Sequence, residues 1–223
     1  MKKSVSLKLI VFSFLLVATS ISYSAPVFQA GSGSDSTVAG VGNEASGFQS
    51  SAFGYRNAAD AGYSFAAGNG NRAGDTSSAV GYGNDATGRW SSAFGANNEA
   101  SGEKSSAIGF GNIASRDNSS AFGSRSNASG EKSSAFGTQY KVTGEASGAF
   151  GVGKATWNNT TQVFDYDYIN EGKHSYMFGN YNKIASGSNN NFILGNNVSI
   201  GSGINNSVAL GNNSTVSSSN EVS

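Results

Sequence analysis

Ser106-Ala107-Ile108-Gly109, Ser120-Ala121-Phe122-Gly123 and Ser134-Ala135-Phe136-Gly137 are copies of one motif, set fourteen residues apart. Fourteen residues are too few for a helical repeat unit, but they suffice for a coil of two short strands and two tight turns. One such coil buries little apolar surface, so neighbouring coils must stack. The motif therefore predicts an all-β solenoid of about 14-residue coils, whose function lies along an extended surface.

The closing glycine of each motif marks the period along most of the chain. The spacing is fourteen, except for one step of thirteen, two of sixteen and a gap of 28 between Gly151 and Gly179. Inside that gap, Thr161–Asp165 imitates the motif, which favours a degenerate coil kept in register within residues 155–178; the alternative is a looped-out hairpin inserted there. The glycines are Gly40, Gly54, Gly68, Gly81, Gly95, Gly109, Gly123, Gly137, Gly151, Gly179, Gly195 and Gly211.

The longer strand of each coil alternates small and large residues, so its two faces differ. One face carries Ala and Gly, and the other carries a column of large apolar side chains. Because a thin two-strand coil has one interior, one of these faces must point outward and requires a partner, and the sequence does not say which. The large column, which forms either a core or an intersubunit interface, comprises Phe53, Phe94, Ile108, Phe122, Phe136 and Phe150.

An asparagine follows the closing glycine by three residues in six successive coils. Asparagine tolerates left-handed turn conformations, and amides stacked coil upon coil can form hydrogen bonds along the axis. We therefore expect a structural ladder, with a ligand-binding row as the alternative, formed by Asn43, Asn57, Asn71, Asn84, Asn98 and Asn112.

Composition excludes several classes of function. The 223 residues include 14 basic and 14 acidic side chains and no Cys, which argues against a nucleic-acid surface, a disulfide framework and a thiolate metal site. His174 is the single histidine and has no evident catalytic partners. The acids Glu103, Asp117, Glu131 and Glu145 recur at one coil position and predict a solvated turn edge, with a row of cations as the alternative. We expect no enzyme activity, cofactor or metal.

Residues 1–24 have the layout of a secretory signal peptide. Lysines at positions 2 and 3 precede an apolar run from Leu9 to Ala18, and small residues, Ser22 and Ser24, follow it. The run is short for a bilayer span. The sequence therefore predicts export, with residues 25–223 forming one elongated repeat domain.

An aromatic cluster interrupts the small-residue pattern near the 28-residue gap. Aromatic side chains that carry a polar group are common at protein and glycan contacts. The alternative role is to fill a wider coil. The candidate partner-binding residues are Trp157, Phe164, Tyr166, Tyr168 and Tyr176.

From about residue 32 onward the repeats resemble the head repeats of trimeric autotransporter adhesins, the YadA-like head family. The units Asn206–Gly211 and Asn191–Gly195 are most similar to the Asn-Ser-Val-Ala-Ile-Gly motif of that family. The resemblance implies a left-handed parallel β-roll, a homotrimer and a non-enzymatic adhesin head. Such a head attaches to host extracellular matrix, cells or other bacteria, in a virulence role, through a matrix protein or a cell-surface glycan.

The chain departs from that family in showing no apolar heptads of a stalk and no run of membrane strands of an anchor. We therefore expect no membrane insertion after signal removal. The protein is at the cell surface if the chain is part of a longer adhesin, and periplasmic or secreted otherwise. The alternatives to an adhesin head are a truncated autotransporter fragment without independent function and a polysaccharide-acting β-helix protein.

Overall fold

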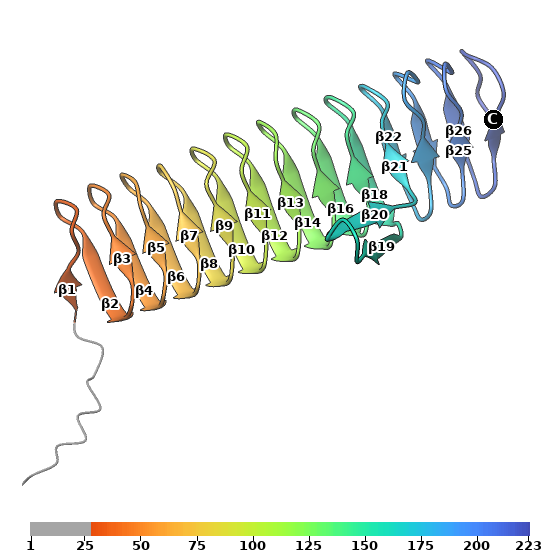
Figure 1. Cartoon of the computed structure of the whole chain (residues 1–223). Helices are drawn as coiled ribbons and strands as arrows, with labels where there is room; N and C mark the ends of the chain where they lie inside the picture. The colour runs from red at the N-terminus through yellow and green to blue at the C-terminus, as the bar shows by residue number, and fades with distance from the viewer. Residues whose placement is uncertain (1–27) are drawn as a thin grey trace, which may run out of the picture.

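The computed structural model describes residues 28–223, which form one column of stacked coils (Figure 1). The expected all-β solenoid is confirmed. The segment assigned to the signal peptide, residues 1–24, lies outside the described residues. Within residues 28–223, no helix has the length and apolarity needed to cross a bilayer.

The longer strand of each coil belongs to a 13-stranded sheet, here called sheet A. Its strands pair in parallel and in register, apart from the first, which pairs antiparallel with the second. In sheet order they are β1 Gln29–Ala30, β2 Thr37–Val41, β4 Ser51–Tyr55, β6 Phe65–Asn69, β8 Ser78–Tyr82, β10 Ser92–Ala96, β12 Ser106–Phe110, β14 Ser120–Ser124, β16 Ser134–Thr138, β18 Gly148–Val152, β22 Tyr176–Phe178, β24 Phe192–Leu194 and β26 Val208–Leu210.

Two-residue strands from the other side of each coil form a 12-stranded sheet, here called sheet B, again with parallel pairing. Its strands are β3 Glu44–Ala45, β5 Ala58–Ala59, β7 Arg72–Ala73, β9 Asp85–Ala86, β11 Glu99–Ala100, β13 Ile113–Ala114, β15 Asn127–Ala128, β17 Lys141–Val142, β21 Ile169–Asn170, β23 Lys183–Ile184, β25 Ser199–Ile200 and β27 Thr215–Val216.

The closing glycine of the motif is required by the close approach of neighbouring coils. Gly109 has a φ of 121°, which L side chains rarely adopt, and a Cβ there would collide with the carbonyl oxygen of Gly123 in the next coil. The motif glycine therefore sets both the backbone turn and the distance between coils.

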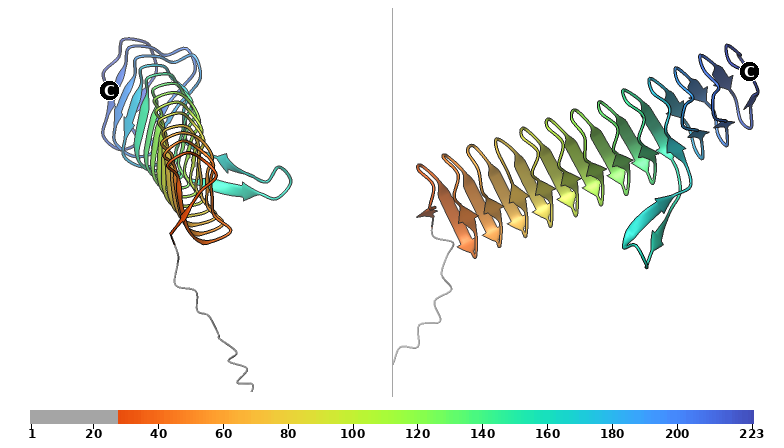
Figure 2. Two further views of the ribbon diagram at one scale, coloured as in Figure 1. Left: turned by 90° about the vertical axis from the view of Figure 1, so that its left-hand side faces the viewer. Right: turned by 45° about the horizontal axis from the view of Figure 1, so that its top comes forward.

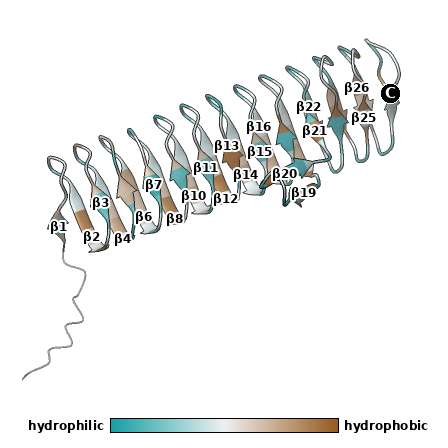
Figure 3. Ribbon diagram, in the orientation of Figure 1, coloured by the Kyte–Doolittle hydropathy of each residue, from teal (hydrophilic) through white to brown (hydrophobic). Residues whose placement is uncertain are grey.

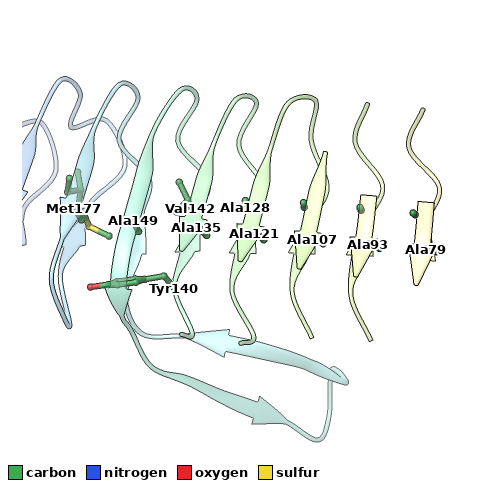
Figure 4. Close-up of a cluster of buried hydrophobic side chains, with 14 of the residues drawn as sticks. Ala79, Ala93, Ala107, Ala121, Ala128, Ala135, Tyr140, Val142, Ala149 and Met177 are labelled. Carbon is green, nitrogen blue, oxygen red and sulfur yellow. The ribbon is translucent and has the colours of Figure 1, made fainter. Parts of the chain in front are cut away.

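Alanine fills the interior of the coils between the two sheets (Figure 4). Ala93, Ala107 and Ala121 on sheet A and Ala114 on sheet B are fully buried. An alanine methyl contributes only about 0.8 kcal/mol of burial, so a single coil cannot be stable without its neighbours. In the sixteen-residue coils near the C-terminus the interior is wider, and Met177, Ile184, Ile193 and Ile200 take the place of alanine.

The six asparagines lie in one row inside the turn that follows sheet A. Asn71 illustrates their contacts: its Nδ2 donates to Asn57 Oδ1 at 2.9 Å and to the Gly81 carbonyl at 2.8 Å. Its own Oδ1 accepts from the backbone N–H of Asn84 at 3.0 Å. The row thus supplies hydrogen bonds to backbone groups that the turn leaves without sheet partners.

Tyr140 extends this row past the point where asparagine is missing. Its side chain is fully buried, and its hydroxyl donates to the Gly179 carbonyl at 2.9 Å and accepts from the Asn182 N–H at 3.0 Å. These are the same kinds of backbone group that asparagine satisfies elsewhere. Because the ring spans the interrupted coil, the hydroxyl reaches backbone groups that lie 39 and 42 residues after Tyr140 in the sequence.

Between Gly151 and Gly179 the structure has the looped-out hairpin instead of the expected degenerate coil. The hairpin consists of β19 Ala155–Asn158 and β20 Val163–Tyr166, paired antiparallel, and β18 pairs directly with β22. Thr161–Asp165 therefore forms no coil strand. The segment leaves the column at one edge of the stack (Figure 2), because β21 already supplies the sheet B strand of that coil.

The N-terminal end of the column is covered. β1 reverses direction and pairs with β2, and Phe28 contacts Phe53 with ring centroids 5.9 Å apart. Such a reversal blocks the edge strand, which would otherwise pair with another sheet.

Candidate binding surfaces

The outer face of sheet A carries large apolar side chains along the whole column, beside a serine at the start of most strands from β4 to β16. The large residues point away from the coil, so the column expected to form either core or interface does not form the core. Phe122, Phe136, Phe150 and Phe178 stack with ring centroids 4.6 to 5.1 Å apart. Brown, hydrophobic segments recur from coil to coil (Figure 3). Exposed large apolar residues on sheet A are Val41, Tyr55, Phe65, Tyr82, Phe94, Phe110, Val152, Tyr176, Leu194 and Leu210.

The two sheets differ in charge. None of the strands of sheet A contains a charged residue, whereas the outward position of sheet B carries Arg72, Asp85, Glu99, Lys141 and Lys183. A charged face is suited to water, and an uncharged apolar face of this length is typical of an interface. The remaining residues of the sequence-predicted column, Phe53, Phe94 and Ile108, lie on the same outer face of sheet A.

The hairpin is attached to the column by its aromatic side chains. Tyr166 Oη donates to the Arg125 carbonyl at 3.0 Å, and burial raises the pKa of Tyr166 to about 12. At the base of the hairpin, Lys154 forms an ion pair with Asp167 at 3.2 Å. The hairpin projects from the side of the column (Figure 2) and extends along the direction of the stack, past several neighbouring coils (Figure 4). These contacts fix the position of the hairpin relative to the column.

A groove of about 660 Å³ lies between the hairpin and the column. Trp157 and Phe164 line it from the hairpin, and their rings pack edge to face at a centroid distance of 5.1 Å. Ile113 and Asn127 on sheet B form its floor, beside Phe110 at the end of β12. A volume of this size lies within the range of small-ligand pockets, about 300–1,000 Å³.

The structure separates the five aromatic residues proposed for partner binding. Trp157, Phe164 and Tyr166 gather at the groove. Tyr168 packs against the interior cluster and lies 5.3 Å from the Tyr181 ring. Tyr176 lies on β22, on the outer face of sheet A. Phe110 and Arg125 also line the groove, and no sequence pattern marks them because their contacts with the hairpin are long-range.

The recurrent acids lie at the turn edge. Glu103 and Glu131 each pair with the adjacent lysine at 2.9 Å, and Glu145 pairs with Lys173 at 3.2 Å. The hydrogen bond from Lys173 lowers the pKa of Glu145. His174 is exposed at a turn with a φ of 51°. Across the described part of the chain, no three His, Asp or Glu side chains are grouped to hold a metal ion.

The chain matches one protein family, described as YadA head domain repeat (2 copies). The matched segments are residues 45–71, 86–112, 100–126, 114–139 and 205–220. No curated protein matches the chain. YadA-like heads are generally non-enzymatic parts of adhesins that are exported to the cell surface and form homotrimers. The matched segments and the stacked coils into which they fold show that the chain carries YadA head repeats, as the sequence resemblance predicts.

Proposed function

We propose that this chain is the trimeric, non-enzymatic head of an adhesin, exported by residues 1–24 and attaching to host matrix, cells or other bacteria. The observation that carries the proposal is the difference between the two sheets. Sheet A presents an uncharged face with part-exposed large apolar side chains over its full length, and sheet B presents charged side chains. Three copies that meet through sheet A bury this apolar face and leave sheet B and the hairpin in water.

The trimer also accounts for the stability of a narrow column. Alanine interiors contribute little burial per coil, whereas complete burial of a Phe, Ile or Leu side chain contributes about 1.5–3 kcal/mol, of which a half-exposed side chain gains roughly half between copies. Such a head is stiff, because neighbouring coils are connected through the ladders of two sheets and, in six successive coils, also through the asparagine row. Stiffness and length suit a module that reaches a partner away from the bacterial surface.

The test is the oligomeric state of the purified chain together with its adhesion. Light scattering at micromolar concentration should give three times the mass of one chain. Surfaces coated with extracellular matrix proteins and monolayers of host cells should retain the trimer above an uncoated control. A monomer in solution contradicts the assembly, and a trimer that adheres to neither surface nor to other bacteria contradicts the adhesin function.

A further inference from the structure

The groove beneath the hairpin contains two cations without an acidic partner. Arg125 and Lys141 both line it, and within residues 28–223 neither forms an ion pair with Asp or Glu. By contrast Arg72, on the same outward column of sheet B as Lys141, pairs with Asp85 at 3.6 Å. The charge in the groove is therefore available to a ligand.

The guanidinium of Arg125 is held between two aromatic rings. Its Cζ lies 5.5 Å from the Phe110 centroid and 5.2 Å from the Phe164 centroid, so one ring comes from the column and the other from the hairpin. This packing restricts the side chain and leaves the edge of its planar fork free for two parallel hydrogen bonds to a carboxylate or sulfate. Lys141 Nζ lies near the Tyr166 ring, 6.0 Å from its centroid.

Amide side chains complete the groove. Asn97, Asn127 and Gln162 line it, and each amide can both donate and accept. The side-chain oxygen of Asn127 is shielded from solvent and has no hydrogen-bond partner. Rotation of this amide toward a ligand hydroxyl gives that oxygen a partner, which removes the cost of an unsatisfied polar atom.

One carboxylate limits the kind of anion that fits. Glu99 also lines the groove and stands three strands from Lys141 in sheet B, with β13 and β15 between them, roughly 14 Å away at the spacing of β-strands. A polyanion that runs along the column would meet Glu99 and then Asp85. A short ligand with its acid at the Lys141 end and neutral hydroxyls toward Glu99 avoids this repulsion.

We propose that the groove binds an acidic saccharide: Trp157 and Phe164 stack on a sugar ring, Arg125 and Lys141 bind its carboxylate or sulfate, and the amides bind its hydroxyls. Trp157 is 45% exposed, so its face is accessible to a ligand. Aromatic faces bind the C–H surface of a sugar, and a cation with amides supplies the polar contacts. This proposal rests on the adhesin function and assigns its ligand class.

The experiment uses the purified full-length assembly on an array of sialylated, uronic-acid and sulfated glycans, each beside its uncharged core structure. We expect binding to acidic glycans and not to the cores, and comparison of carboxylated with sulfated glycans identifies the acid. Arg125→Gln should reduce that binding about tenfold, because a charge-assisted contact is lost. Trp157→Ala should reduce it as well.

The repeats provide matched controls. Arg56 occupies the coil position of Arg125 and lies 4.8 Å from the Tyr55 ring centroid, as Arg125 lies near Phe110, but it has no hairpin beside it. Lys183 occupies the position of Lys141 on sheet B. Arg56→Gln and Lys183→Gln should change binding less than twofold. Thermal melting of each variant shows whether the coil is intact.

Several results overturn the proposal. These are binding to no acidic glycan above its core, equal losses in Arg56→Gln and Arg125→Gln, or binding to an acidic peptide but to no glycan. A change of oligomeric state when the hairpin is removed also overturns the proposal, since that result would mean that a second copy of the chain occupies the groove. Failure of the adhesin function gives a different result, in which the wild-type trimer adheres to neither matrix nor cells.

Discussion

At the scale of single residues, Tyr140 shows how a repeat tolerates an interruption. Where the hairpin leaves the column, no asparagine is available, and the buried hydroxyl of Tyr140 satisfies the Gly179 carbonyl and the Asn182 N–H instead. The longer side chain of tyrosine thus makes the hydrogen bonds that an asparagine makes in other coils. Tyr140 is therefore a structural residue, although its sequence neighbour Lys141 lines the groove.

Tyr140→Phe should lower the free energy of unfolding by about 1–3 kcal/mol, because it leaves a part-buried carbonyl and a buried N–H without a partner. Tyr166→Phe removes a hydroxyl from the hairpin and is the matched control. It loses one hydrogen bond to Arg125 and should lower the melting temperature less. Chemical denaturation of both variants checks this, and equal losses would contradict the special role of Tyr140.

Alkaline pH should destabilise the protein through the same residue. Burial raises the pKa of Tyr140 from 10.0 to about 12, so the folded state keeps the proton that the unfolded chain releases near pH 10. This stabilisation is complete below pH 10 and is lost as pH rises toward 12. Melting temperatures measured across this range should fall more steeply for the wild type than for Tyr140→Phe. Parallel curves would show that another group titrates.

Ala107→Glu should destabilise the column by more than about 3 kcal/mol, because Ala107 is fully buried between coils and nothing there can solvate a carboxylate. Asn118→Lys should change stability by less than about 0.5 kcal/mol. Asn118 is an exposed turn residue with a φ of 57°, and Lys104 and Lys132 adopt the same conformation in adjacent coils. Thermal unfolding of the two variants distinguishes these sites.

At the scale of elements, the hairpin is an insertion between two positions of an ordinary coil. Ile169 pairs with Lys141 and Asn170 pairs with Val142, which is the same register as between the other neighbouring strands of sheet B. The ends of the insertion lie together, since the Asp167 N–H donates to the Lys154 carbonyl at 2.9 Å. The element can therefore vary without disturbing the column.

Deletion of residues 155–168, which joins Lys154 to Ile169, removes fourteen residues and turns the 28-residue gap into a normal period, 28 − 14 = 14. We expect a folded column with the wild-type oligomeric state and a melting temperature within a few degrees of the wild type. Circular dichroism and light scattering measure both. Aggregation or loss of cooperative melting would mean that the hairpin is part of the core.

At the scale of the whole molecule, sheet A is the face through which we propose that copies associate. Its strands contain no charged residue from β2 to β26. A sheet face that is exposed to water typically carries polar side chains instead. Because the strands of sheet A pair in register, the outward side chains of successive coils line up on one face, and in the proposed assembly each coil adds to the same interface.

Phe136→Arg should dissociate the assembly into folded single chains. Phe136 points outward between the Phe122 and Phe150 rings, so the substitution charges the interface without changing the coil interior. Ala58→Arg places the same charge on the outward position of sheet B, next to Arg72, and should leave the assembly intact. The two masses from light scattering decide between sheet A and sheet B as the interface.

The sequence by itself determined the period, the strand positions and the asparagine row, because each is repeated locally in every coil and the repeats must align to pair. Only the tertiary structure decided three features. Alanine forms the interior instead of phenylalanine, because both columns are apolar and only the narrow space between the sheets selects the smaller one. Residues 155–166 form a hairpin, because a gap of two periods fits an extra coil and an insertion equally well. The groove exists because Tyr166 bonds to Arg125 across 41 residues, a contact that no local pattern encodes.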